Sequence, residues 1–206
     1  ETIEQAQAAT ERAIDRVVEE VEQGKDRAAE AATELLADAE TLLTHDYSTT
    51  VLTAIAGAVE DGADLTVYVT EARPRYLGRK TARRLAEFDA VETKLVVDSA
   101  AGHVLPEVDR VLTGMTCIVD ERLYNRVGTY PIAATAADLD VPVNVVGSSA
   151  KIVAEGFGFE NEFRPASEVM REPAEGFGIE NPTYDATPTR LLESVVTDDG
   201  TIEPPL

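Results

Sequence analysis

Residues 65–88 read LTVYVTEARPRYLGRKTARRLAEF, an apolar, β-branched run followed by a basic turn and a helical pattern. The run 65–70 predicts a buried strand, and 78–88 predicts the helix that follows it. A buried strand that leads directly into a helix is typical of a parallel sheet covered by helices. This stretch therefore indicates an α/β fold.

The same alternation continues on both sides of this stretch. Further strands are expected at 41–44, 93–97, 110–113, 117–119 and 142–146, and further helices at 48–60, 128–139 and 189–195. Strands separated by helices of this length predict a parallel sheet with helices on both faces. We assign this α/β domain to residues 41–206.

Residues 1–40 have a purely helical pattern. One apolar stripe consists of Ile14, Val17, Val18 and Val21, and a second runs from Ala28 to Ala39. Gly24 stands between them and is expected to break the helix. We therefore predict a short helical extension at 1–40, folded as an antiparallel pair of helices.

The net charge is the strongest global feature of the composition. The chain carries 39 acidic and 18 basic residues, which gives −21. Such a charge repels itself at low salt, whereas the screening length falls to about 3 Å at 1 M salt. We therefore predict a protein of a high-salt cytoplasm; an acidic protein from ordinary salt is the alternative. The charge also argues against direct nucleic-acid binding, which needs Lys and Arg.

Several other classes of protein find no support in the sequence. The single cysteine, Cys117, excludes an intrachain disulfide and fits a reducing, cytoplasmic location. No apolar run approaches the ~20 residues of a membrane helix, and no secretory signal is visible. The zinc, dinucleotide and P-loop motifs are absent, so no metal and no cofactor is predicted.

Ligands of such sheets bind beyond the carboxyl ends of the strands, which directs attention to the residues after each strand. Six basic residues fall within the 12 positions 73–84 of this otherwise acidic chain. Arg73 lies in the turn after the strand 65–70, where a guanidinium can bind phosphate oxygens in pairs. The alternative, a basic helix face paired with acidic neighbours, is expected for Arg83 and Arg84.

Four other residues are candidates for ligand binding. His45 precedes a helix, where an anion site and a hydrogen-bonded structural histidine are both open. Asp98 ends a strand and is expected either to meet a ligand hydroxyl or to cap a turn. Asn125 and Arg126 lie just before a helix start with free backbone amides, which indicates a second site for an oxyanion.

Taken in order, five segments resemble one family. They are LTHDYS at 43–48, VTEARP at 69–74, DSAAG at 98–102, NRVGTY at 125–130 and NPTYDATP at 181–188. The family holds the alpha, beta and delta regulatory subunits of translation initiation factor two B, together with methylthioribose phosphate isomerase and ribose bisphosphate isomerase. The resemblance implies a three-layer, Rossmann-like domain preceded by helices, a homodimer formed through the C-terminal domain, and a pocket for a phosphorylated sugar or nucleotide.

The two branches of the family differ in catalytic groups. The isomerases resemble one another in a cysteine and an aspartate at positions that here hold Asp46 and Thr116. Isomerisation needs positioned acid and base groups, and a threonine hydroxyl is no general base near neutral pH. The sequence thus predicts a noncatalytic homologue of the regulatory subunits that binds a sugar phosphate or nucleotide and a translation factor partner. The alternative is an aldose–ketose isomerase with Asp46 as its base. The predicted ligand-binding residues are His45, Arg73, Asp98, Asn125 and Arg126.

Overall fold

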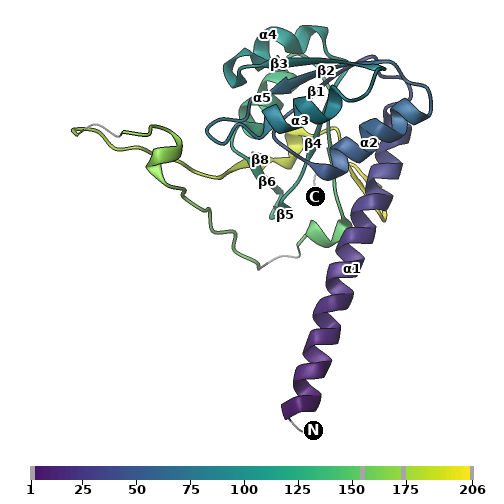
Figure 1. Cartoon of the computed structure of the whole chain (residues 1–206), viewed down its shortest axis with the longest axis vertical. Helices are drawn as coiled ribbons and strands as arrows, with labels where there is room; N and C mark the ends of the chain where they lie inside the picture. The colour runs from purple at the N-terminus through teal and green to yellow at the C-terminus, as the bar shows by residue number, and fades with distance from the viewer. Residues whose placement is uncertain (1–2, 154–155, 173–174, 205–206) are drawn as a thin grey trace.

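The computed structural model describes residues 3–153, 156–172 and 175–204, and it confirms the α/β fold (Figure 1). A seven-stranded sheet has the order β10-β9-β7-β4-β1-β2-β3, and its strands are parallel except for the β9–β10 pair. These strands are β1 (Thr41–Thr44), β2 (Leu65–Thr70), β3 (Val91–Val96), β4 (Arg110–Gly114), β7 (Val143–Val146), β9 (Ser194–Thr197) and β10 (Gly200–Ile202). A small antiparallel sheet contains β5 (Cys117–Val119), β6 (Arg122–Arg126) and β8 (Tyr184–Pro188).

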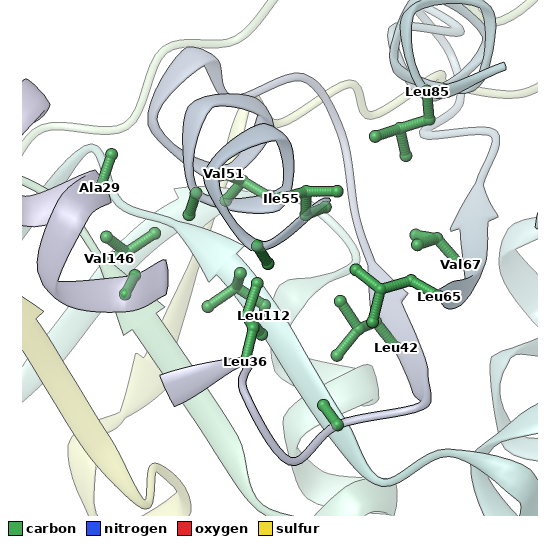
Figure 2. Close-up of a cluster of buried hydrophobic side chains, with 14 of the residues drawn as sticks. Ala29, Leu36, Leu42, Val51, Ile55, Leu65, Val67, Leu85, Leu112 and Val146 are labelled. Carbon is green, nitrogen blue, oxygen red and sulfur yellow. The ribbon is translucent and has the colours of Figure 1, made fainter. Parts of the chain in front are cut away.

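Helices cover both faces of the large sheet, which gives the three predicted layers. The helices are α1 (Ile3–Leu35), α2 (Thr49–Glu60), α3 (Gly78–Leu85), α4 (Ala101–Val104) and α5 (Thr129–Asp138). One buried core joins α1, α2 and α3 to the sheet, and a second joins α4 and α5 to it. Figure 2 shows the first core, where Val51 and Ile55 of α2 lie over Leu112 of β4.

The order of the strands fixes where a ligand can bind. From β1 the chain proceeds to β2 and β3 on one side of the sheet, and later to β4, β7 and β9 on the other. The direction of winding therefore reverses between β1 and β4. In open parallel sheets, ligands bind beyond the carboxyl ends of the strands at such a reversal.

The predicted pair of N-terminal helices is wrong, because α1 is one continuous helix through Gly24. A Cβ atom at Gly24 would lie 2.5 Å from Ser148 Oγ and 2.9 Å from Asp198 Oδ2. The glycine therefore permits a close approach between α1 and the loops of the sheet rather than ending the helix. Figure 1 shows that the N-terminal half of α1 projects beyond the domain, and there Ile14 and Val17 are more than half exposed.

The predicted closing helix at 189–195 is also wrong. Residues Thr189–Leu191 form one 3-10 turn, and β9 follows as a buried strand parallel to β7. The sequence of β9, Ser-Val-Val-Thr, is rich in β-branched residues, which favour a buried strand. The strands β6 and β8 were not predicted. Asn125 and Arg126, which were expected in a turn just before a helix, form the end of β6.

No helix among the described residues combines the length and the apolar character that crossing a membrane requires.

Candidate functional site

A hollow of about 310 Å³ opens at the reversal point, beyond the carboxyl ends of β1 and β4. We call it the α2 hollow, because the first turn of α2 forms part of its wall. Its charged lining consists of Lys25, Asp46, Arg75, Arg126 and Lys151. Four of these side chains are cationic and one is a carboxylate. The hollow is therefore positively charged within a chain of net charge −21.

A second, narrow hollow of about 20 Å³ lies beside the first. We call it the arginine hollow, because Arg73, Arg75, Arg126 and Arg164 line it. Asp46, Arg75 and Arg126 border both hollows. The buried hydroxyl of Thr183, which also lines it, has no hydrogen-bond partner in the described part of the chain.

Asp46 is the central acidic group of the site. Its side chain is buried, and Oδ2 lies 3.2 Å from Nε of Arg126. The backbone is held as well, because the Thr81 hydroxyl donates a hydrogen bond of 2.6 Å to the Asp46 carbonyl. Burial raises the pKa of the Asp46 carboxyl above its usual value, while the positive charge of Arg126 acts in the opposite direction. A buried carboxyl with a raised pKa suits proton transfer.

His45 connects three parts of the structure. Its Nε2 lies 2.9 Å from the Val127 carbonyl, which can only accept, so Nε2 carries the proton. Its Nδ1 lies 2.6 Å from Thr70 Oγ1, and these two atoms share a second hydrogen bond. His45 lines the α2 hollow, yet both ring nitrogens bind protein. These contacts favour the structural alternative over the predicted ligand contact.

Asp98 and Asn125 brace the site. The carboxylate of Asp98 accepts hydrogen bonds from the backbone amides of Ala72 and Arg73, at 2.7 and 2.8 Å. It therefore holds the turn after β2, a role that the sequence did not predict, instead of capping the next turn along the chain. The amide of Asn125 donates to Thr113 Oγ1 at 3.1 Å and to Thr129 Oγ1 at 3.2 Å. Asn125 lines the α2 hollow while linking β4 to α5.

The basic segment after β2 divides into two groups. Arg84 pairs with Glu87 as predicted, whereas Arg83 donates to the Arg79 carbonyl at 3.4 Å. Arg73 lines the arginine hollow with its side chain exposed, and its contact with a phosphate stays a prediction.

Sequence reasoning missed four basic residues of the site, which are Lys25, Arg75, Lys151 and Arg164. Arg75 borders both hollows, and no hydrogen bond or ion pair links it to another described residue. Lys151 follows β7, and its Nζ donates to the Met115 carbonyl at 2.8 Å. Burial lowers the pKa of the Lys151 amine. Its position just after a predicted strand was a usable signal, whereas Lys25 lies on a helix that was expected to pack separately.

The two positions that distinguish the branches of the family meet at this site. Asp46 follows β1, Thr116 follows β4, and both line the α2 hollow. Lys151 lines it too, and it is an ionisable group that the comparison of Asp46 with Thr116 left out.

The fold and the site define a parallel α/β protein with a positively charged hollow at the reversal point of its sheet. Residues 1–204 match the Initiation factor 2 subunit family, and the chain belongs to this family. The resemblance of the five segments is thereby confirmed.

Relatives in this family include isomerases. The ribose 1,5-bisphosphate isomerase of Haloterrigena turkmenica is 31% identical, in an alignment covering 99% of this chain and 67% of the relative. The ribose 1,5-bisphosphate isomerase of Haloferax volcanii is 34% identical, in an alignment covering 82% of this chain and 54% of the relative. The crystal structure of translation initiation factor eIF-2B, subunit delta, from A. fulgidus has a TM-score of 0.82 and 26% identity. The superposition covers 100% of this chain and 65% of that one. This chain thus spans between half and two thirds of the length of these proteins.

The prediction of a noncatalytic regulator is corrected by these relatives. Several of them, at 31–34% identity, are named ribose 1,5-bisphosphate isomerase, which favours the isomerase alternative. The prediction rested on the loss of an acid and base pair at two positions. It omitted the partly buried amine of Lys151, which lines the same hollow as Asp46.

Proposed function

We propose that the chain catalyses the aldose–ketose isomerisation of a phosphorylated sugar, with ribose 1,5-bisphosphate as the first candidate substrate. The observation that carries the proposal is the position of Asp46, a buried carboxyl with a raised pKa that borders two cationic hollows. The relatives named as isomerases support the same class of reaction.

The cationic groups are arranged for a substrate with two phosphates. One phosphate fits the α2 hollow, where Lys151 and the free amides of the first turn of α2 can bind it. The second fits the rim of the arginine hollow, where Arg73 and Arg75 are exposed. The sugar between them would then lie against Asp46.

The reaction needs two proton transfers at this place. In the conversion of a cyclic aldose 1-phosphate into a ketose, the bond between C1 and the ring oxygen breaks and a hydride moves from C2 to C1. The C2 hydroxyl loses its proton to become the carbonyl, and the ring oxygen gains a proton. Asp46 accepts the hydroxyl proton. Lys151 donates the proton to the ring oxygen. Its ammonium has three N–H bonds, so one can donate to the Met115 carbonyl and one to the phosphate while the third serves as the acid.

Phosphorus NMR tests this function directly. The full chain is incubated with ribose 1,5-bisphosphate in about 1 M KCl, where surface charge is screened. We expect new ketose bisphosphate signals from the wild type. Asp46→Asn should lower kcat by about 100-fold or more, the usual contribution of a general base.

The control is Asp89→Asn, which removes an exposed carboxylate just before β3, at the amino-terminal end of the parallel strands, whereas the site lies at their carboxyl ends. It should turn over like the wild type. Full activity in Asp46→Asn would show that Asp46 is not the base. If the phosphorus spectrum of the substrate does not change with the wild type, the isomerase proposal is rejected.

The homodimer and the cytoplasmic location expected from the sequence belong to the same proposal. Light scattering of the full chain at several concentrations should give twice the chain mass; a mass of one chain throughout would reject the dimer.

A further inference from the structure

We propose that Lys25 of α1 binds a phosphate of the substrate together with Lys151, so that the N-terminal helix completes the site. This inference deepens the proposed function and rests on it for the identity of the substrate. It concerns a residue outside the α/β domain as the sequence divided it, since Lys25 belongs to the helical extension.

Three contacts fix α1 where Lys25 meets the α2 hollow. Gly24 lets the helix approach Ser148, as described above. Nη2 of Arg27 lies 3.2 Å from Oδ2 of Asp198, and Oδ1 of the same carboxylate accepts a hydrogen bond of 2.6 Å from the Ser149 amide. The loop after β7, which carries Lys151, is thus joined to the segment of α1 that carries Lys25. Both lysines line the hollow from a fixed framework.

The distribution of charge points to an anion between the two lysines. The chain has four lysines in all, and two of them line this one hollow. Burial and the positive charge of Lys25 both lower the pKa of Lys151, so the two ammonium groups repel each other. Nζ of Lys151 binds the carbonyl of Met115 and no carboxylate. A phosphate dianion would relieve this repulsion and accept hydrogen bonds from both amines.

Glu22 holds Lys25 in the ligand-free structure. Its Oε1 lies 2.5 Å from Lys25 Nζ, and the Glu22 side chain is exposed while that of Lys25 is partly buried. A pair with a solvent-exposed carboxylate contributes little stability, so a phosphate can displace the carboxylate. The Glu22→Gln variant, which releases Lys25, should therefore bind phosphate more tightly than the wild type.

The test measures binding rather than turnover. Ribose 1,5-bisphosphate and inorganic phosphate are titrated separately into the full chain carrying Asp46→Asn, and the phosphorus line widths give the affinities. Lys25→Met should weaken binding of the bisphosphate about 10- to 100-fold, the range for loss of a charged hydrogen bond. Lys25→Arg should restore most of the affinity, which would show that the helix still folds and that the charge is required.

Lys94→Met is the matched control, because it removes the same charge from an exposed lysine of β3 that pairs with Glu92. It should bind like the parent variant. Equal affinities for Lys25→Met and the parent would overturn the role of Lys25 and leave the isomerase intact. Phosphate binding that depends on Lys25, without turnover by the wild type, would keep the role and reject the isomerase. Binding of neither ligand would overturn both.

Discussion

Oδ2 of Asp46 lies 3.2 Å from Nε of Arg126, and this ion pair borders both cationic hollows. Burial raises the pKa of Asp46, whereas the guanidinium of Arg126 lowers it. His45 and Arg75 lower it as well. The carboxyl must be ionised to accept a proton, so the balance between burial and these neighbours sets the pH at which the proposed base begins to act.

The first prediction is therefore an acidic limb in the pH dependence of kcat/KM. Activity should rise with pH through the folded-state pKa of Asp46, at a pH above the ordinary value of 3.8. Replacing Arg126 with Gln removes the charge that favours ionisation, so this limb should move to higher pH. A limb that stays in place in Arg126→Gln would show that Asp46 is not the titrating group.

A second prediction concerns the alkaline limb. If the ammonium of Lys151 donates a proton, activity should fall as pH rises through its pKa, which burial places below the ordinary 10.5. In Lys151→Arg the guanidinium keeps its proton throughout this range, so the alkaline limb should disappear and kcat should fall. If the alkaline limb is unchanged in Lys151→Arg, a group other than Lys151 causes it.

A third prediction tests the structural role of His45. Its Nδ1 is hydrogen-bonded to the hydroxyl of Thr70, which is fully buried. Thr70→Val keeps the shape but leaves the imidazole nitrogen without its partner, so the free energy of unfolding should fall by about 1–3 kcal/mol. Thr70→Ser retains the hydroxyl and should lose less. Equal stability of the valine variant and the wild type in a denaturant titration would contradict this role.

The strands β1, β2, β3, β4 and β7 were predictable from local patterns because they are short apolar runs that alternate with helices, whereas β9 was mistaken for a helix. The position of Asp46 followed from the rule that ligands bind beyond strand ends, and that of Arg126 from its place before a helix start. The roles of Asp98 and His45 were not fixed by sequence, because each depends on a partner 25 to 26 residues away along the chain. The role of Lys25 could not be predicted, because a glycine such as Gly24 can either end a helix or let a continuous helix pack closely against its neighbours.

The fourth prediction follows from that packing of Gly24. In an exposed helix, Gly→Ala stabilises by about 1 kcal/mol. At Gly24 the added Cβ would lie 2.5 Å from Ser148 Oγ, so Gly24→Ala should destabilise the chain by about 1–3 kcal/mol, as overpacking does. Gly102→Ala in α4 is the control, because its Cβ would make an ordinary contact of 3.5 Å with Thr135. Stabilisation by Gly24→Ala in thermal unfolding would show that α1 is not packed as described.

The fifth prediction concerns salt and the charge of the chain. The end of α2 carries Glu60, Asp61 and Asp64, all exposed, and no basic residue stands in its last turn. Carboxylates there face the negative end of the helix dipole and repel one another, at a cost of about 0.3–1 kcal/mol for each charge at low salt.

Replacing these three carboxylates with amides should raise Tm in dilute buffer. The gain should shrink as KCl rises to about 2 M, because the screening length becomes shorter than the distance between the charges. The wild type should itself gain stability over the same range, as expected of a chain with a net charge of −21. Sucrose, which strengthens burial without screening charge, should leave the difference between the two proteins unchanged. If the difference in Tm between the amide variant and the wild type did not change with KCl, screening of charge would not be what stabilises this acidic fold.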